Sequence, residues 1–159
     1  MPRATIELPD QYHFKTGLTV RITDINYGSH LGNDTILAYI HEARLRFLSH
    51  FGFSEKDIDG AGIIMADAVI VYKSQAFYGD LLIIQIAVSD LSKRACDFIY
   101  KITRESDGKE IARAKTRIAF FDYQKNGTIA IPDKFRAFFQ SPDTSLNWKK
   151  ASRNQYIKS

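Results

Sequence analysis

The apolar pattern from Asn33 to Phe51 limits the folds open to this chain more than any other part of the sequence. Its apolar side chains recur at intervals of three and four residues, and they are Ile36, Leu37, Ile40, Ala43, Phe47, Leu48 and Phe51. This spacing predicts an α-helix with one apolar stripe, which must be buried against another element. Asn33 or Asp34 is suited to cap the start of the helix, and Gly52 stands where a C′ glycine would end it.

Five other segments have the alternation or the composition of β-strands. They are Tyr12 to Asp24, Ile63 to Ser74, Leu81 to Leu91, Ala95 to Arg104 and Glu110 to Tyr123. Short connections between successive strands, such as the turn at Asp107-Gly108, favour an antiparallel meander. A short second helix is expected from Asp133 to Gln140. We therefore predict an α+β domain whose long helix lies on the concave face of a curved sheet of about five strands. The open edges of such a sheet favour pairing in a dimer.

The length of 159 residues suits one domain, which we assign to residues 1–140. Residues 141–159 carry four basic side chains and one acidic side chain, and we expect them to form a flexible, solvated tail. The charges of the remaining chain nearly balance, which argues against a nucleic-acid-binding groove.

Membrane insertion and secretion are not expected. No apolar run approaches the roughly 20 residues that span a bilayer, and residues 1–10 lack the apolar core of a signal peptide. The expected location is the cytoplasm. Cys96, the one cysteine, cannot form an internal disulfide and is expected to be a small core residue. No metal-ligand spacing surrounds it, and no metal site is predicted.

The loop that leads into the long helix is the candidate active site. It holds several short polar or titratable side chains, namely Asp24, Asn26, His30, Asn33 and Asp34. The first N–H groups of a helix have no partner within the helix, and the helix dipole adds positive potential there. These groups suit an anion or a developing oxyanion. A turn followed by an N-cap explains the same composition, so that structural alternative stays open.

The segment Asp24-Ile25-Asn26-Tyr27-Gly28-Ser29-His30-Leu31-Gly32-Asn33, followed by His41-Glu42-Ala43-Arg44, resembles the hot-dog-fold acyl-CoA thioesterases related to 4-hydroxybenzoyl-CoA thioesterase. Their pattern is roughly Asp-x-Asp-x-x-Gly-His-x-x-Asn, then a helix with Glu-Ala-Arg. Val71-Tyr72-Lys73-Ser74 and Tyr78-Gly79-Asp80 also look like parts of that family, and the resemblance covers about residues 12–125. It implies a hot-dog fold, a homodimer or homotetramer with sites between subunits, and no cofactor other than the coenzyme A of the substrate.

The chain departs from the family pattern at two positions. Asn26 stands where the family often has its catalytic aspartate, and Ser29 stands where it has glycine, with Gly28 one place earlier. An asparagine cannot act as a general base, but it can orient a water or donate to a carbonyl oxygen. The identity of the base is therefore the open part of the assignment.

The predicted catalytic residues are Asn26, His30, Asp34 and Glu42. Each of the last three has a structural alternative, because His30 can be a loop histidine, Asp34 a cap and Glu42 an exposed or subunit-contact residue. The predicted substrate-binding residues are Tyr27, Gly28, Gly32, Asn33, Lys73, Arg113, Lys115 and Arg117. The last three share one strand face and are candidates for the phosphates of coenzyme A, or else form a solvated outer face.

Arg44 falls within the apolar stripe of the helix, where a charge is rarely left unpaired. We expect it to form a structural ion pair with Asp24. The leading functional hypothesis is an acyl-CoA thioesterase. Its alternatives are a non-catalytic acyl-binding module on the same fold, which Asn26 favours, and a thioesterase for acyl-carrier-protein substrates, which a basic surface would suit.

Overall fold

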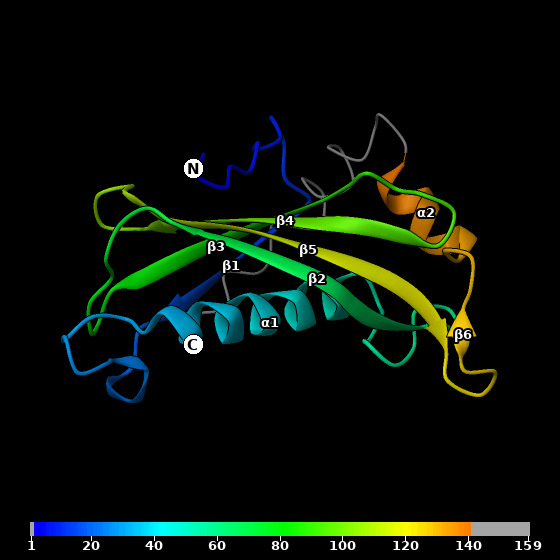
Figure 1. Ribbon diagram of the computed structural model, residues 1–159, viewed down its shortest axis with the longest axis horizontal. Coiled ribbons are helices and arrows are strands. Elements are labelled where there is room, and N and C mark those ends of the chain that lie inside the picture. The colour runs from blue at the N-terminus through cyan, green and yellow to red at the C-terminus, as the bar shows by residue number, and fades with distance from the viewer. Residues whose placement is uncertain (1, 141–159) are drawn as a thin grey trace.

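A long helix lies along the concave face of a curved antiparallel sheet in the computed structural model, which describes residues 2–140 (Figure 1). The helix, α1, spans Asn33–His50. The other elements are β1 (Phe14–Thr19), the 3-10 helix η1 (Ile22–Asp24), β2 (Gly62–Tyr72), β3 (Leu81–Ser89), β4 (Ala95–Arg104), β5 (Glu110–Asp122), β6 (Gly127–Thr128) and α2 (Asp133–Phe139). The predicted α+β architecture is confirmed, and β6 is an addition to the five expected strands.

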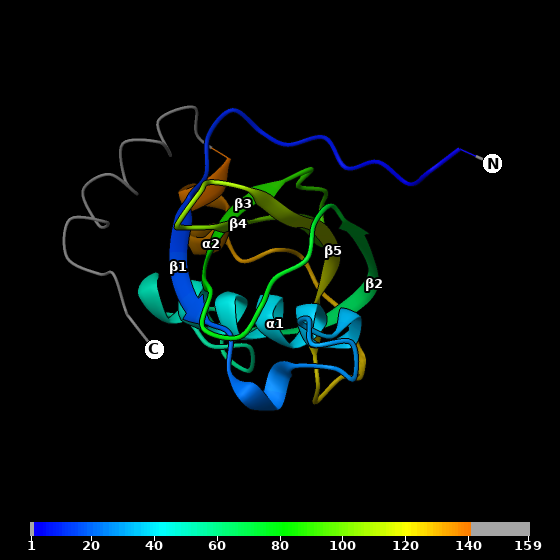
Figure 2. The ribbon, with the colours of Figure 1, turned by 90° about the vertical axis from the view of Figure 1, so that its left-hand side faces the viewer.

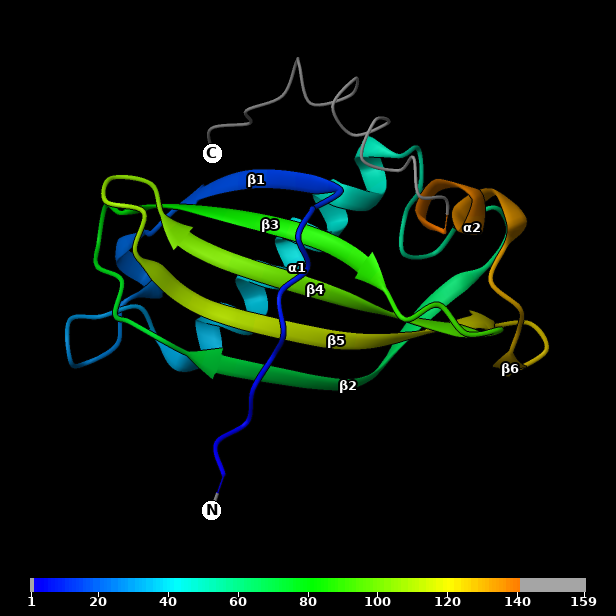
Figure 3. The ribbon, with the colours of Figure 1, turned by 90° about the horizontal axis from the view of Figure 1, so that it is seen from above.

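The strand order is β1-β3-β4-β5-β2, with β6 paired to β5, and every pairing is antiparallel (Figure 3). Strands β3, β4 and β5 form a meander, but the prediction of a simple meander is wrong for β2, which pairs with β5 and not with β3. The eight residues 73–80 that join β2 to β3 reach up to about 26 Å. They therefore span the roughly 14 Å of three strand spacings at the end of the sheet.

The apolar stripe of α1 forms the centre of the core. Ile36, Ile40, Phe47 and Leu48 are buried between the helix and the sheet. Leu37 belongs to the predicted apolar stripe but is 39% exposed, because the sheet covers only one side of the helix. The C′ glycine is confirmed, since Gly52 has φ +82°.

The entry to α1 differs from the prediction in two ways. The N-cap is Gly32, and the expected caps Asn33 and Asp34 are the first two helical residues. Strand β1 ends at Thr19, short of the predicted Asp24, because the chain then turns into η1. Val20 is the first residue after β1, and its backbone hydrogen bonds join it to Gly79 and Asp80, in the loop before β3, and not to a neighbouring strand.

The two faces of the sheet are covered differently. Helix α1 lies under the concave face, while the N-terminal segment crosses the convex face (Figures 2 and 3). Cys96 is buried and free, as expected for a small core residue. The described residues contain no helix that is long and apolar enough to cross a membrane. The predicted basic tail, residues 141–159, lies outside the described residues.

Candidate functional site

The loop that leads into α1 is folded around the side chain of Asn26. The Oδ1 atom of Asn26 accepts hydrogen bonds from the N–H of Gly28 (2.9 Å) and of His30 (3.3 Å). The backbone N–H of Asn26 donates to the carbonyl of His30 at 2.8 Å and closes the turn. Because backbone donors hold the amide oxygen, the amide nitrogen of Asn26 is the end left to donate to a ligand.

Ser29 explains why the related family has a glycine at this position. Its φ is +66°, in the left-handed region that costs a residue with a side chain about 1 kcal/mol. Gly28, one residue earlier, does not have a positive φ. The loop therefore keeps its turn despite the serine and carries some backbone strain at Ser29.

The first turn of α1 offers unpaired donors to this loop. The N–H of Thr35 donates to the carbonyl of Gly32 at 3.0 Å, whereas nothing in residues 2–140 accepts from the N–H groups of Asn33 and Asp34. Tyr72, at the end of β2, donates from its hydroxyl to the carbonyl of Asn33 at 2.9 Å. This hydrogen bond ties the start of the helix to the sheet.

A cavity of about 240 Å³ lies beside the first turn of α1, toward β2 and β5. It brings together four of the predicted residues, Asn26, His30, Asn33 and Lys73. The remaining lining residues are Leu31, Ile36, Tyr72, Ser74, Gln75, Ala76 and Ile111. None of these described lining residues is a carboxylate. We call this space the helix-start cavity.

The other predicted catalytic residues do not line the helix-start cavity. Asp34 is exposed on the first turn of α1. Glu42 is exposed, lies 3.5 Å from Arg46, and lines a separate cavity between α1 and β1. Among the predicted binding residues of the loop, Tyr27 is fully exposed and neither Gly28 nor Gly32 is part of the lining. A Cβ on Gly32 would lie 2.7 Å from Oδ1 of Asp34, which is the end of an exposed side chain and can rotate away.

The basic residues of β5 lie on the convex face of the sheet, away from α1, and share that face as their alternation predicted. Arg113 pairs with Glu110 and also donates to the carbonyl of Ile6 at 3.0 Å, under the N-terminal segment. Arg117 pairs with Asp97 and Asp90, both at 3.1 Å. Lys115, between the two arginines, is half-buried. The hypothesis that these residues bind coenzyme A phosphates stays a prediction.

Arg44 is 6% exposed and forms the expected ion pair, but the predicted partner is wrong. Its Nε donates to Oε1 of Glu55 at 3.0 Å, and its Nη1 donates to the hydroxyl of Tyr100 at 3.1 Å. Burial opposes ionisation of Glu55, but its hydrogen bonds with Arg44 and His41 hold the pKa of Glu55 below the ordinary value. The middle of α1 thus reaches the loop that follows the helix, not the loop that precedes it.

Asp24 has different partners. Its Oδ2 accepts from the hydroxyl of Tyr39 at 2.5 Å and from the backbone N–H of Arg21 at 3.1 Å. Burial alone would raise the pKa of Asp24, but these hydrogen bonds outweigh burial and hold the pKa below the ordinary value. Asp24 is therefore a charged structural anchor between η1 and α1.

Sequence reasoning assigned no role to Tyr72, Ser74 and Gln75, which all line the helix-start cavity. They belong to the end of β2 and the connection that follows it, and β2 reaches α1 only because it pairs with β5. The one signal in the sequence was the similarity of residues 71–74 to the family. Within residues 2–140, no group of three His, Cys, Asp or Glu side chains is arranged to hold a metal ion.

Comparisons with known proteins agree with this geometry. The sequence model of the thioesterase-like superfamily matches residues 20–139. No curated protein matches the sequence. Among solved structures, a 1,4-dihydroxy-2-naphthoyl-CoA thioesterase from Synechocystis is 20% identical with a TM-score of 0.74, over 82% of this chain and 97% of that one.

Two further structures share the fold at similar identity. A thioesterase superfamily protein from Jannaschia sp. CCS1 is 18% identical with a TM-score of 0.76, over 87% of each chain. A gentisyl-coenzyme A thioesterase is 16% identical with a TM-score of 0.70, over 79% of this chain and 99% of that one. The fold is thus the hot-dog fold of thioesterases.

Proposed function

Because the chain belongs to the thioesterase-like superfamily, we propose that it hydrolyses acyl-CoA thioesters in the helix-start cavity. The observation that carries this proposal is the joint position in one cavity of Asn26, His30 and Asn33, beside the unpaired N–H groups of the first turn of α1. A thioester carbonyl needs donors where its oxygen becomes negative, and the water that attacks it needs a base.

The proposed roles follow from the atoms that each group leaves available. The N–H groups at the start of α1, with the amide nitrogen of Asn26, donate to the carbonyl oxygen. His30 takes a proton from the attacking water, since histidine is the most frequent general base and His30 lines the cavity. The carbon–sulfur bond then breaks, the acid is released, and the proton passes to the departing thiolate of coenzyme A.

Tyr72 acts as a positioning residue in this proposal. Its hydroxyl holds the carbonyl of Asn33 at 2.9 Å, so it fixes the peptide groups at the start of the helix. Lys73 follows it in the lining of the cavity, is exposed, and is a candidate to bind a coenzyme A phosphate.

We also propose that the site is completed in a homodimer through the free edge of β2. Arg46 occupies the other edge of the sheet, where its Nη1 donates to the carbonyl of Gly17 in β1 at 2.9 Å. Strand β2 instead carries exposed apolar side chains, including Met65, which is 45% exposed. An open apolar edge of this kind pairs readily with a second copy. Sedimentation of the wild type as a dimer, and of Met65→Lys as a monomer, is the expected result.

Hydrolysis is tested by offering the purified protein a panel of acyl-CoAs and following free thiol. The panel contains linear chains, hydroxyaryl thioesters such as those named for the structural neighbours, and one acyl-carrier-protein thioester. His30→Ala is expected to lower kcat by about 100-fold. His41→Ala is the control, since His41 is an exposed histidine further along α1. Equal rates for the two variants would remove His30 from the mechanism.

A second candidate function is acyl-CoA binding without hydrolysis. The absence of a carboxylate from the described lining of the helix-start cavity favours it. Titration of a non-hydrolysable thioether analogue of acyl-CoA separates the candidates. Saturable binding of the analogue by folded protein that releases no thiol from any member of the panel would replace hydrolysis with binding.

A further inference from the structure

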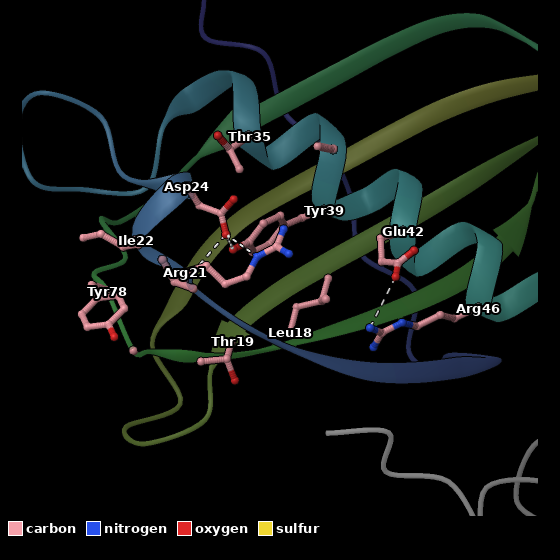
Figure 4. Close-up of a pocket in the computed structure, with 13 residues that line it drawn as sticks. Leu18, Thr19, Arg21, Ile22, Asp24, Thr35, Tyr39, Glu42, Arg46 and Tyr78 are labelled. Carbon is pink, nitrogen blue, oxygen red and sulfur yellow. Dashed lines mark hydrogen bonds and ion pairs between the residues drawn. The ribbon is translucent and has the colours of Figure 1, made fainter. Parts of the chain in front are cut away.

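A second and larger cavity, of about 730 Å³, lies between α1 and β1 (Figure 4). It faces the β1 edge of the sheet, whereas the helix-start cavity faces β2 and β5, and the two share no lining residue. One side is a stripe of α1 formed by Thr35, Ala38, Tyr39, Glu42 and Arg46. We call this space the α1–β1 cavity. The proposed thioester chemistry makes no use of it.

Asp24 gives the α1–β1 cavity an acceptor atom that the described residues leave unpaired. The residue is 9% exposed, and its three hydrogen bonds all end on Oδ2, from the hydroxyl of Tyr39 and from two nitrogens of Arg21. No residue in the described part of the chain donates to Oδ1. Since Asp24 lines the cavity and its side chain is anchored through Oδ2, Oδ1 is a fixed acceptor for a donor that enters the cavity.

The charges around the cavity favour a ligand without a net charge. The guanidinium of Arg21 lies 3.4 Å from Oδ2 of Asp24, so the carboxylate already has a cation beside it. Glu42 has the same relation to Arg46 at 3.5 Å. The two carboxylates and the two guanidiniums of the lining balance, so the cavity as a whole requires neither a cation nor an anion. A carboxylate placed at Oδ1 of Asp24 would nevertheless meet a like charge. A neutral hydroxyl satisfies Oδ1 at the smallest electrostatic cost.

The rest of the cavity suits an elongated apolar body. Leu18, Ile22, Ala38 and Tyr78 contribute apolar surface; Leu18 lies between Asp24 and Arg46, whereas Ile22 and Tyr78 lie beyond Asp24 (Figure 4). Along α1 the lining runs from Thr35 to Arg46, a distance of about 16 Å at the rise of an α-helix. The volume lies within the range of pockets that bind small molecules. A globular ligand would fill this elongated shape poorly.

We propose that the α1–β1 cavity binds a neutral amphipathic alcohol whose hydroxyl donates to Oδ1 of Asp24 and whose aliphatic body lies along α1. This site is separate from the thioester site, so it does not depend on the proposed hydrolysis. It gives the protein a second ligand of a different chemical class.

The test is a titration of the full-length protein with decanol, followed by amide chemical shifts in NMR. We expect saturable shifts in residues 18–24 and 35–46. Decanoate should bind more weakly, because its carboxylate has no hydrogen to donate to Oδ1 of Asp24 and carries the same charge. Ala38→Trp fills the cavity and is expected to weaken decanol binding at least tenfold. Leu37→Trp, on the neighbouring exposed position of the same helix, is the matched control and should bind like the wild type.

Three results would overturn the proposal. One is the absence of saturable decanol binding up to its solubility limit. Another is decanol binding that Ala38→Trp leaves unchanged. The third is decanoate binding as tight as that of decanol, which refutes the role of Asp24 and needs no variant. Thiol release is not part of this experiment, so a failure here and a failure of hydrolysis remain distinguishable.

Discussion

Replacing Tyr39 with phenylalanine tests the anchor that joins η1 to α1. The change removes the hydroxyl that donates to Asp24 at 2.5 Å and leaves the ring in place. A hydrogen bond to a charged, buried carboxylate contributes about 1.5–3 kcal/mol. We expect the free energy of unfolding of Tyr39→Phe to fall by about 2 kcal/mol at pH 7. The matched control is Tyr123→Phe, which removes a hydroxyl that donates to a neutral carbonyl, that of Ile63, at 3.0 Å.

The pH dependence gives this prediction a second signature. The folded pKa of Asp24 is lowered, so its contribution is fully present above the unfolded pKa of about 3.9 and is lost as the pH falls through the folded pKa. The difference between wild type and Tyr39→Phe should therefore shrink in acid. Urea denaturation at a series of pH values measures it, with an unchanged m-value as the check on two-state behaviour. A loss no larger than that of Tyr123→Phe, or one independent of pH, would show that the hydroxyl of Tyr39 does not stabilise the charged form of Asp24.

Three further predictions concern stability. Phe47→Ala, in the fully buried centre of α1, should cost about 3–5 kcal/mol in urea denaturation, and a loss below about 1 kcal/mol would contradict the packing described. Ser29→Gly should raise the melting temperature by relieving about 1 kcal/mol of left-handed strain, whereas an unchanged or lower value would mean that Ser29 is not strained. Burial lowers the pKa of His13 to about 4, so its contribution to stability is lost as the pH falls from about 6.5 toward that value. His13→Phe should flatten this part of the pH profile, and a profile that keeps its slope would exclude His13 as the cause.

Local patterns predicted the elements of the fold well, because they depend on neighbours in the sequence. The period of apolar residues located α1 within one residue at its end, and the alternation along β5 placed its three basic residues on one face. The position of β2 beside β5 could not be read in the same way. It depends on a loop that crosses the end of the sheet, and strand composition does not encode which strand becomes the neighbour.

The site was predictable in its location and less so in its members. Asn26, His30 and Asn33 lie within one short loop, so adjacency in sequence brought them together. Tyr72 could not be found this way, because its contact with Asn33 spans 39 residues and requires the β2–β5 pairing. The partner of Arg44 was missed for a related reason. Asp24 is already held by Tyr39, and Glu55 approaches from the loop after the helix.

The most direct test of the account is the rate of free-thiol release by the wild type and by Asn26→Ala on the best acyl-CoA of the panel. We predict measurable turnover by the wild type and a loss of about 100-fold in kcat on removal of the amide donor. Circular dichroism of both proteins establishes that they are folded. A wild-type rate indistinguishable from that of buffer, or an unchanged kcat for Asn26→Ala, would contradict hydrolysis at the start of α1.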